Sequence, residues 1–314
     1  MVLLVQKLSK FYSKLENHHP HHHPRAEVDV LSASLRAFRS DVSNYMNQLL
    51  SLNPKPRSEI LSFSWIQRCF QLLPLVNMAF LKLVEDIDYP MTSWEAASLD
   101  QYLNFGLHLL ELLNSVSSSL SHLSQARLSF AHGLALLENS PSVALKHLKP
   151  IQPQSSSKDI KGLLHEQDCV GKFGSCKERV INEAMMEMKS IGFWVFGVVL
   201  ASLSGETKPY LEMKQVISRF NGALLIDVVD SCVFDVIMEK GATLKEVKEL
   251  NHAAGSLVSA IVSGETSDAA MDLEEKLGVF EKEMDVLEKQ ADTLFSKVLA
   301  TRNEQLHCVR QCKQ

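Results

Sequence analysis

Residues 273–298 read LEEKLGVFEKEMDVLEKQADTLFSKV, and this stretch decides the fold. Its apolar side chains recur at alternating steps of four and three residues, and Glu, Lys and Asp fill most of the positions between them. A heptad pattern of this kind predicts one long helix whose single apolar stripe packs against other helices. The stripe consists of Leu273, Leu277, Phe280, Met284, Leu287, Ala291, Leu294 and Val298.

The same spacing returns near the other end of the chain, and no segment alternates with a period of two for long enough to predict a sheet. We therefore expect an all-α protein, an elongated bundle of long antiparallel helices with coiled-coil-like heptad packing. The N-terminal seam consists of Leu31, Leu35, Phe38, Val42, Tyr45, Leu49 and Leu52. Helices are predicted over residues 28–52, 58–87, 92 to about 137, 210–238, 244–263 and 268–310.

Composition narrows the class of function. Of the 314 residues 46% are hydrophobic and 22% are charged, as in an ordinary globular protein. The net charge of −5 at pH 7 and the lack of a basic stripe argue against a nucleic-acid partner. The six cysteines lack the paired spacing of zinc sites, so we expect free thiols, no bound metal and no cofactor. Because no phosphate loop, nucleophile elbow, metalloprotease motif or kinase motif is present, we expect a protein that is not an enzyme.

Proline, glycine and serine divide the chain into four parts. Residues 1–27 form an amphipathic N-terminal segment with a His/Pro linker, and residues 28–140 form an N-terminal helical region. Residues 141–175 are predicted to be a flexible linker, and residues 176–314 a C-terminal helical region.

Two alternatives stay open for the first part. Residues 1–16 place apolar side chains among Lys7, Lys10 and Lys14, a pattern that suits either a docking helix or a helix on a membrane surface. The five histidines of residues 18–23 follow as a solvated linker, although imidazoles so close together are also able to hold a divalent metal loosely.

Two capping boxes mark predicted helix starts. Thr92 precedes Glu95 by three residues, so the threonine hydroxyl and the glutamate carboxylate can satisfy each other's backbone N–H groups. Thr243 and Glu246 repeat this spacing.

The most apolar window is residues 191–203, and it is shorter than the roughly 20 residues needed to cross a bilayer. It is predicted to be a buried central helix. The alternative is a segment inserted in a membrane, with lipid contacted by Phe193, Trp194, Phe196 and Val199.

One combination of motifs resembles a known family. A Ser-Trp pair on one predicted helix is followed by an acidic turn with proline and by a Trp-Glu pair that opens the next helix. This combination resembles the plant BYPASS family of developmental regulators over about residues 28–305. It is carried by Ile60–Ile66 (ILSFSWI), Asp86–Pro90 (DIDYP), Ser93, Trp94, Glu95, Tyr102, Leu109, Leu110, Leu112 and Asn114. Trp65 and Trp94 are interpreted as core anchors, and Thr92 and Glu95 as the cap.

The resemblance implies a non-enzymatic plant regulator or adaptor, related to proteins that restrain a root-derived mobile signal that arrests growth. It implies action through protein–protein contacts, with relatives connected to the exocyst, and we expect a cytoplasmic protein. The alternative is a peripheral or inserted endomembrane protein linked to vesicle tethering. The seams leave open whether the helices also pack against a second copy.

Overall fold

The computed structural model describes residues 24–50, 59–154, 174–220 and 225–311. Within these ranges the fold is all-α, as predicted, and no strand is present. The predicted N-terminal helix 1–16 and the histidine tract lie outside the described residues. The elements are α2 (Pro24–Leu50), α3 (Phe63–Asp86), the 3-10 helix η2 (Met91–Ser93), α4 (Ala96–Leu136), α5 (Pro141–His147), α7 (Cys176–Ser204), α8 (Lys208–Ile217), α9 (Asp227–Lys240), α10 (Lys245–Ser263) and α11 (Ser267–Gln311).

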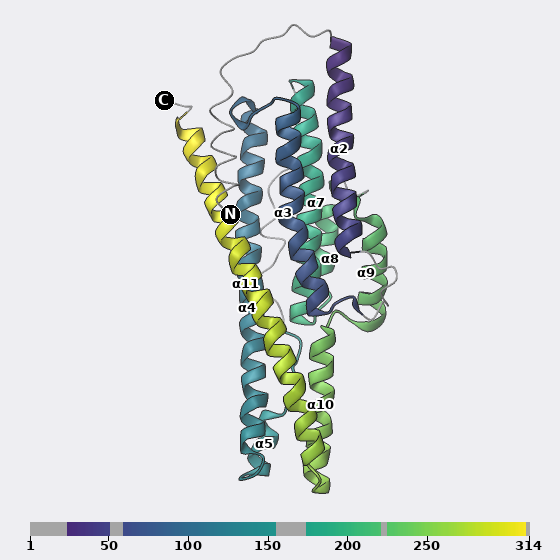
Figure 1. Ribbon diagram of the computed structural model, residues 1–314, viewed down its shortest axis with the longest axis vertical. Coiled ribbons are helices and arrows are strands. Elements are labelled where there is room, and N and C mark those ends of the chain that lie inside the picture. The colour runs from purple at the N-terminus through teal and green to yellow at the C-terminus, as the bar shows by residue number, and fades with distance from the viewer. Residues whose placement is uncertain (1–23, 51–58, 155–173, 221–224, 312–314) are drawn as a thin grey trace.

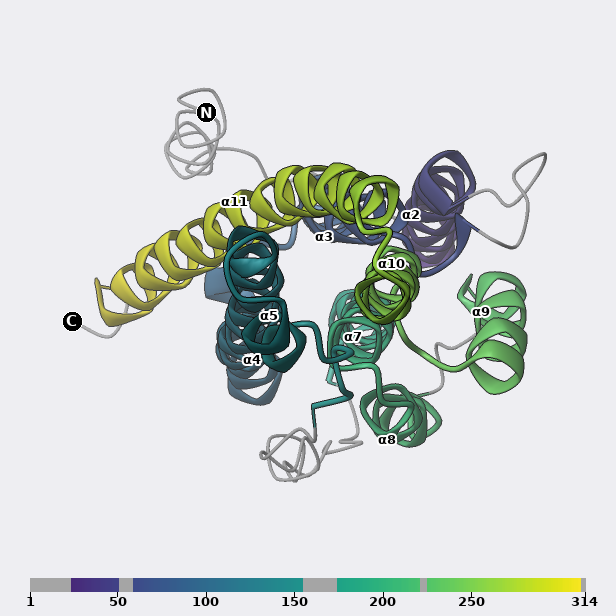
Figure 2. The ribbon, with the colours of Figure 1, turned by 90° about the horizontal axis from the view of Figure 1, so that it is seen from below.

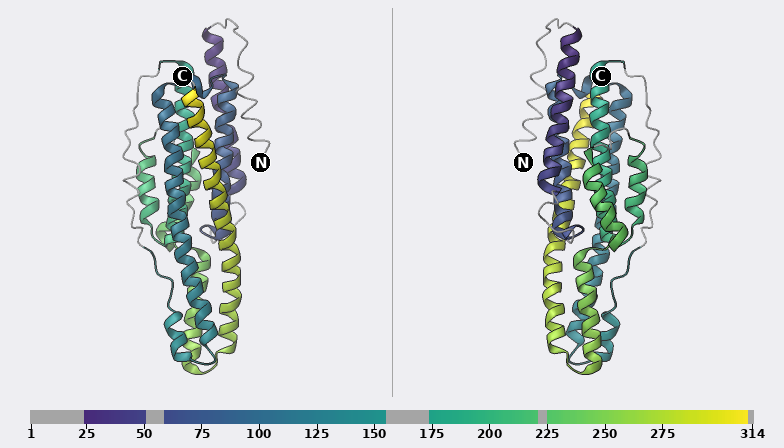
Figure 3. Two further views of the ribbon diagram at one scale, coloured as in Figure 1. Left: turned by 90° about the vertical axis from the view of Figure 1, so that its left-hand side faces the viewer. Right: turned by 90° about the vertical axis from the view of Figure 1, so that its right-hand side faces the viewer.

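Two very long helices give the molecule its elongated shape (Figure 1). The 41 residues of α4 and the 45 residues of α11 correspond to lengths of about 60 and 68 Å. They run in opposite directions and pack together along much of that length. The pairs α2–α3 and α10–α11 are antiparallel as well, as the prediction required (Figures 1 and 3).

Helix α7 occupies the centre of the bundle (Figure 2). It packs against α2, α3, α4 and α8, and from Val180 to Ser204 all of its side chains but that of Met186 and that of Glu183 are buried. The hydrophobic core is a single cluster to which both predicted helical regions contribute. Residues 28–140 and 176–314 therefore fold around one shared core.

Apolar seams of the two predicted heptad helices face this core. On α11 the seam residues from Leu273 to Ala291 are each at most 7% exposed, whereas Leu294 is half-buried at the edge. On α2 the predicted positions Leu31, Leu35, Phe38 and Val42 are buried. Beyond Val42 the prediction is off by one residue, because Met46 and Leu50 are buried there and the predicted Tyr45 is only half-buried. Each Å² of apolar surface that is removed from water stabilises the fold by about 25 cal/mol. This hydrophobic burial is the main contribution that holds these helices together.

The predicted linker differs from the structure in its first part. Residues 141–147 form α5, which starts with Pro141 in the first turn, where its missing N–H costs nothing. The chain then runs against α10, because Ile151 N donates to Asn251 Oδ1 at 2.7 Å and Asn251 Nδ2 donates to Ile151 O at 3.1 Å. Gln154 N also donates to Ser204 O at the end of α7. Residues 141–154 thus belong to the bundle, and residues 155–173 lie outside the described part.

The prediction of one helix over residues 210–238 is wrong. Two helices, α8 and α9, take its place, and α8 ends at Ile217. The apolar spacing continued through this region, but the sequence contains Asn221 and Gly222, a pair that favours a turn over a helix interior. The break allows α9 to turn back toward α7 and α8.

The second predicted capping box does not form. Leu244, not Thr243, is the N-cap residue of α10, and no side chain caps this end. The carboxylate of Glu246 instead accepts from Phe63 N at 3.1 and 3.2 Å, at the start of α3. A carboxylate is favourable at a helix N-terminus, although burial raises the pKa of Glu246. The residue that was expected to cap its own helix therefore joins α10 to α3.

Candidate functional site

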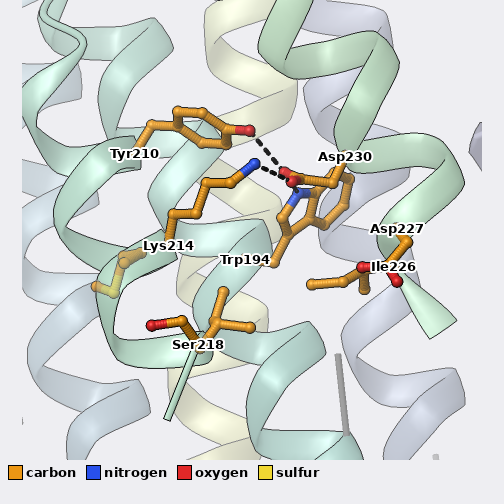
Figure 4. Close-up of a pocket in the computed structure, with 9 residues that line it drawn as sticks. Trp194, Tyr210, Lys214, Ser218, Ile226, Asp227 and Asp230 are labelled. Atoms are coloured by element: carbon orange, nitrogen blue, oxygen red, sulfur yellow. Dashed lines mark hydrogen bonds and ion pairs between the residues drawn. The ribbon is translucent and has the colours of Figure 1, made fainter. Parts of the chain in front are cut away.

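A buried carboxylate at the junction of α7, α8 and α9 is bound by three side-chain donors (Figure 4). Asp230 of α9 accepts from Trp194 Nε1 at 2.8 Å and from Tyr210 Oη at 2.6 Å, both through Oδ1. Its other oxygen, Oδ2, lies 2.5 Å from Lys214 Nζ. Tyr210 and Lys214 are four residues apart on α8, so one face of that helix presents both groups.

Burial keeps the phenol of this cluster protonated. The side chains of Trp194 and Tyr210 are 2% and 1% exposed, so their donors reach no water. Burial, and secondarily the hydrogen bond to Asp230, raises the pKa of Tyr210, which therefore keeps its proton. Lys214 remains 44% exposed through its side chain and places its ammonium 4.6 Å from the centre of the Phe234 ring. The arrangement is one acceptor shared by three donors.

Beside the cluster lies a small pocket of about 110 Å³. Its walls are apolar, and Ser218 and Asp227 stand with Lys214 among its lining residues. Ligand pockets in proteins usually measure about 300–1,000 Å³, so this space suits only a few heavy atoms. The apolar walls come from Met213, Ile217, Ile226 and the Trp194 ring.

The geometry of the Asp230 cluster suits a structural role, in which it holds three helices together, better than catalysis. A nucleophile needs a base that is free to take its proton, whereas here both carboxylate oxygens of Asp230 accept from donors. Within the part of the chain that the structure describes, no three His, Cys, Asp or Glu side chains come close enough together to hold a metal. The cluster fixes α9 on α7 and α8.

A second polar site lies where α7 begins. Tyr89 Oη donates to Glu178 Oε2 at 2.7 Å, and Glu95 N donates to the same oxygen at 3.3 Å. Burial raises the pKa of Tyr89 to about 12, with the hydrogen bond to Glu178 as the next cause. Ser175 caps α7 by accepting from Glu178 N at 3.1 Å. Glu178 itself is fully buried, so the start of α7 is joined to the connection between α3 and α4.

The capping box predicted at Thr92 and Glu95 does not form either. Helix α4 begins at Ala96 with Glu95 as the N-cap residue, and no side chain caps it. Thr92 is exposed within η2. The carboxylate of Glu95 accepts from Gly174 N at 2.9 Å. The capping box predicted a donor in the first turn of the same helix, but the donor in the structure lies 79 residues away in the sequence.

The two tryptophans interpreted as anchors are both buried. Trp65 of α3 is 2% exposed and meets the Trp194 ring edge to face at 6.4 Å between centroids. Trp94 is 7% exposed, packs on Phe80 and Tyr102, and donates through Nε1 to Tyr89 O at 3.0 Å.

The four residues considered for membrane contact lie in the core. Phe193 and Trp194 are 2% exposed, and Phe196 and Val199 are fully buried. Among the described residues, α7 is the one helix whose length and composition would let it cross a membrane, and 94% of its most apolar window is buried inside the protein. In this conformation these side chains contact protein, for example Phe193 on Phe105.

The sequence did not reveal the Asp230 cluster. Its members are spread over 37 residues of the chain. Tyr210 and Asp230 were predicted to lie on one helix, 20 residues apart, so the prediction did not bring them together. The step of four between Tyr210 and Lys214 was a usable signal, because it places a phenol and a cation on one helix face.

Comparison with known proteins identifies relatives. Over 300 residues the chain is 25% identical to Protein BPS1, chloroplastic, of Arabidopsis thaliana, an alignment that covers 90% of this chain and 86% of that protein. The chain is thus similar to BPS1 over nearly its whole length. This result confirms the resemblance to the BYPASS family that the motifs around Trp65 and Trp94 carried.

The BPS1-like chain is also 25% identical over 221 residues to UPF0496 protein 4 from Oryza sativa subsp. japonica and subsp. indica. These alignments cover 64% of this chain and 48% of the rice proteins, so the chain spans about half their length. No protein-family model and no solved structure matches the chain.

Proposed function

We propose that this BPS1-like chain is a non-enzymatic regulator or adaptor of plant development that acts through protein–protein contacts. In its finer form, the proposal is that the protein restrains a root-derived mobile signal that arrests shoot growth. The observation that carries it is the similarity to BPS1 over 90% of the chain. Sequence similarity that extends over nearly the whole bundle favours a role that this protein shares with BPS1 and that involves the whole molecule.

The chemistry of the described residues supports a role without catalysis. The one buried polar cluster with a neighbouring pocket has its carboxylate fully engaged by Trp194, Tyr210 and Lys214. Long helices also expose continuous faces to solvent, and helix faces are a common means by which proteins bind one another.

A rescue experiment tests the proposal. The full-length chain is expressed under a root-specific promoter in Arabidopsis thaliana plants that lack BPS1, and shoot growth is scored. Recovery of the shoot supports the proposal, provided that a destabilised Asp230→Ala variant recovers it less well at equal transcript level. Continued arrest with the wild-type protein present at normal abundance would contradict the developmental role.

The partners and the compartment are part of the proposal. We propose a cytoplasmic protein whose partners include exocyst-related proteins, with an endomembrane protein linked to vesicle tethering as the alternative. The word chloroplastic in the name of the Arabidopsis relative describes that protein. Cross-linking of a tagged chain in plant cells, followed by identification of the captured proteins, tests the partners, and imaging with a plastid marker tests the compartment.

Membrane fractionation separates the two alternatives. Val199 is fully buried in the C-terminal part of α7, and an unpaired carboxylate there costs several kcal/mol. If α7 is a core helix, the wild-type protein leaves the membrane pellet in carbonate, and Val199→Asp makes the protein unfold. If α7 enters a bilayer, the wild-type protein resists carbonate, and Val199→Asp mainly abolishes membrane retention.

A further inference from the structure

A groove between α3 and α11 is the larger of the two pockets described, at about 350 Å³. The two helices run side by side in the same direction here, because Phe63 packs on Phe280 and Gln67 Nε2 donates to Glu283 Oε2 at 3.0 Å. The groove opens further along both helices. It is lined by Phe70, Gln71, Pro74, Val286, Lys289, Gln290, Thr293, Leu294 and Lys297.

The floor of this α3–α11 groove is apolar and partly open to solvent. Val286 of α11 lies beside the buried seam rather than in it and is 39% exposed. Pro74 lies inside α3 and has no N–H, so the carbonyl of Phe70 loses its usual partner within the helix.

Exposed apolar side chains extend the groove at both ends. Val279 stands two turns before Val286 on the same side of α11 and is 54% exposed, and Met78 follows Pro74 by one turn on α3 and is 41% exposed. From Val279 to Lys297 the axis of α11 covers about 27 Å.

The rim of the groove is basic. Lys289 and Lys297 line it, and no carboxylate is among the lining residues. Lys282 lies one turn before Val286 on the same side. Within the described residues neither Lys289 nor Lys297 has an ion-pair partner. Of the nearby carboxylates on α11, Glu281 pairs with Arg127 of α4 at 2.6 Å, and Glu283, at the start of the groove, is engaged by Gln67 of α3.

We infer that the α3–α11 groove binds an acidic amphipathic helix of a partner protein. The walls are two neighbouring helices with stripes of apolar side chains, which is the surface that a third helix packs on. The rim lysines select carboxylates beside the apolar stripe of that helix. This inference rests on the proposed function as an adaptor and names the chemical class of its partner.

Charge also favours an acidic partner helix over two other possible occupants of the groove, the chain's own residues 1–16 and a second copy of the protein. The chain's own residues 1–16 carry Lys7, Lys10 and Lys14, which have the same sign as the rim. A second copy that presented the same groove would bring lysines of the same sign toward this rim. A partner helix that carries Glu or Asp has a negative charge, which is complementary to the lysines of the rim.

A selection experiment tests the inference without a known partner. Displayed helices of about 18 residues carry leucine at i, i+4, i+7 and i+11, and their flanking positions are randomised among Glu, Gln and Lys. They are selected on the immobilised full-length protein and on its Lys289→Glu/Lys297→Glu variant. We expect glutamate to be enriched on the wild type and lysine on the double variant. Failure to enrich glutamate on the wild type would overturn the inference.

Affinity measurements with a selected helix sharpen the test. An exposed ion pair changes affinity by a factor of about 1.5–5, so turning two attractions into repulsions should weaken binding about tenfold. Lys146→Glu/Lys149→Glu, two exposed lysines at the α5 end, is the matched control and should leave the affinity unchanged. Val286→Asn should also weaken binding, whereas Val262→Asn, at an 82% exposed position on α10, should not. Equal affinities for all variants would place the helix outside the groove.

Two further measurements detect other occupants. Binding to phosphatidylserine vesicles that is lost in Lys289→Glu/Lys297→Glu, without selection of any helix, would assign the groove to a lipid surface and refute the inference. A wild-type dimer in solution that this variant dissociates would assign it to a second copy, with the same consequence. Capture of plant partners by both proteins alike would refute the groove but leave the adaptor role intact, whereas capture by neither would count against the adaptor role itself.

Discussion

Replacing Asp230 with alanine removes the acceptor that three donors share. Trp194 Nε1 and Tyr210 Oη are then left in places where 2% and 1% of their residue surfaces reach solvent. A buried donor without a partner costs about 1–3 kcal/mol, so these two together cost about 2–6 kcal/mol. Lys214 turns to water with little loss, because its side chain is already 44% exposed. We expect Asp230→Ala to lower the free energy of unfolding by about 4 kcal/mol, against a typical total of about 5–15 kcal/mol.

Two variants make this prediction specific. Asp230→Asn keeps one oxygen for the indole and the phenol and should cost only about 1–2 kcal/mol. Asp227→Ala, an exposed aspartate one turn earlier on α9, should stay within about 1 kcal/mol of the wild type.

Urea unfolding followed by far-ultraviolet circular dichroism measures the differences, and hydrogen exchange on α9 shows where protection is lost. A loss below about 1 kcal/mol for Asp230→Ala, with α9 still protected, would refute the reasoning, because the donors would then have found other partners.

Two further predictions concern α7. Arg39→Ala leaves the buried carboxylate of Glu187 without its cation and should cost about 2 kcal/mol near neutral pH. Burial already raises the pKa of Glu187, so the folded state binds the proton more tightly than the unfolded chain, and the loss should shrink as the pH of urea unfolding is lowered toward about 5. A pH-independent loss would contradict this account. Gly197→Ala places a Cβ 2.8 Å from Met213 Cβ, and overpacking of about 1–3 kcal/mol should exceed the gain of about 1 kcal/mol in helix propensity. Gly278→Ala on α11 meets nothing within 4 Å and should instead raise the thermal midpoint.

The sequence predicted the long helices well because their signal repeats. The seam of α11 runs through several heptads, so the predicted bounds of 268–310 differ from Ser267–Gln311 by one residue at each end. The boundary between α8 and α9 depended on a single turn signal and was missed. Periodicity averages over many positions, whereas a break depends on one or two.

Both capping boxes failed for one physical reason. Glu95 and Glu246 stand at the right spacing, but each carboxylate accepts from a backbone N–H of a distant segment, Gly174 or Phe63. A local rule cannot weigh donors that only the tertiary fold brings near. The Asp230 cluster was out of reach for the same reason, since its donors come from α7 and α8 and its acceptor from α9.

The polar contacts of α7 explain why so apolar a helix suits the centre of this helical bundle. Along its length Asn182 donates to Ser98 of α4 at 2.8 Å, Glu187 binds Arg39 of α2, and Trp194 donates to Asp230 of α9. Each contact joins α7 to a different helix and is satisfied at one rotation of α7 only, because a turn about its axis would bury these groups without partners. Transfer of α7 to a bilayer would break all three contacts and leave the Glu187 carboxylate in hydrocarbon without its cation. The helix therefore has more to lose from leaving the bundle than its hydropathy alone suggests, and this cost favours the core position over the inserted one.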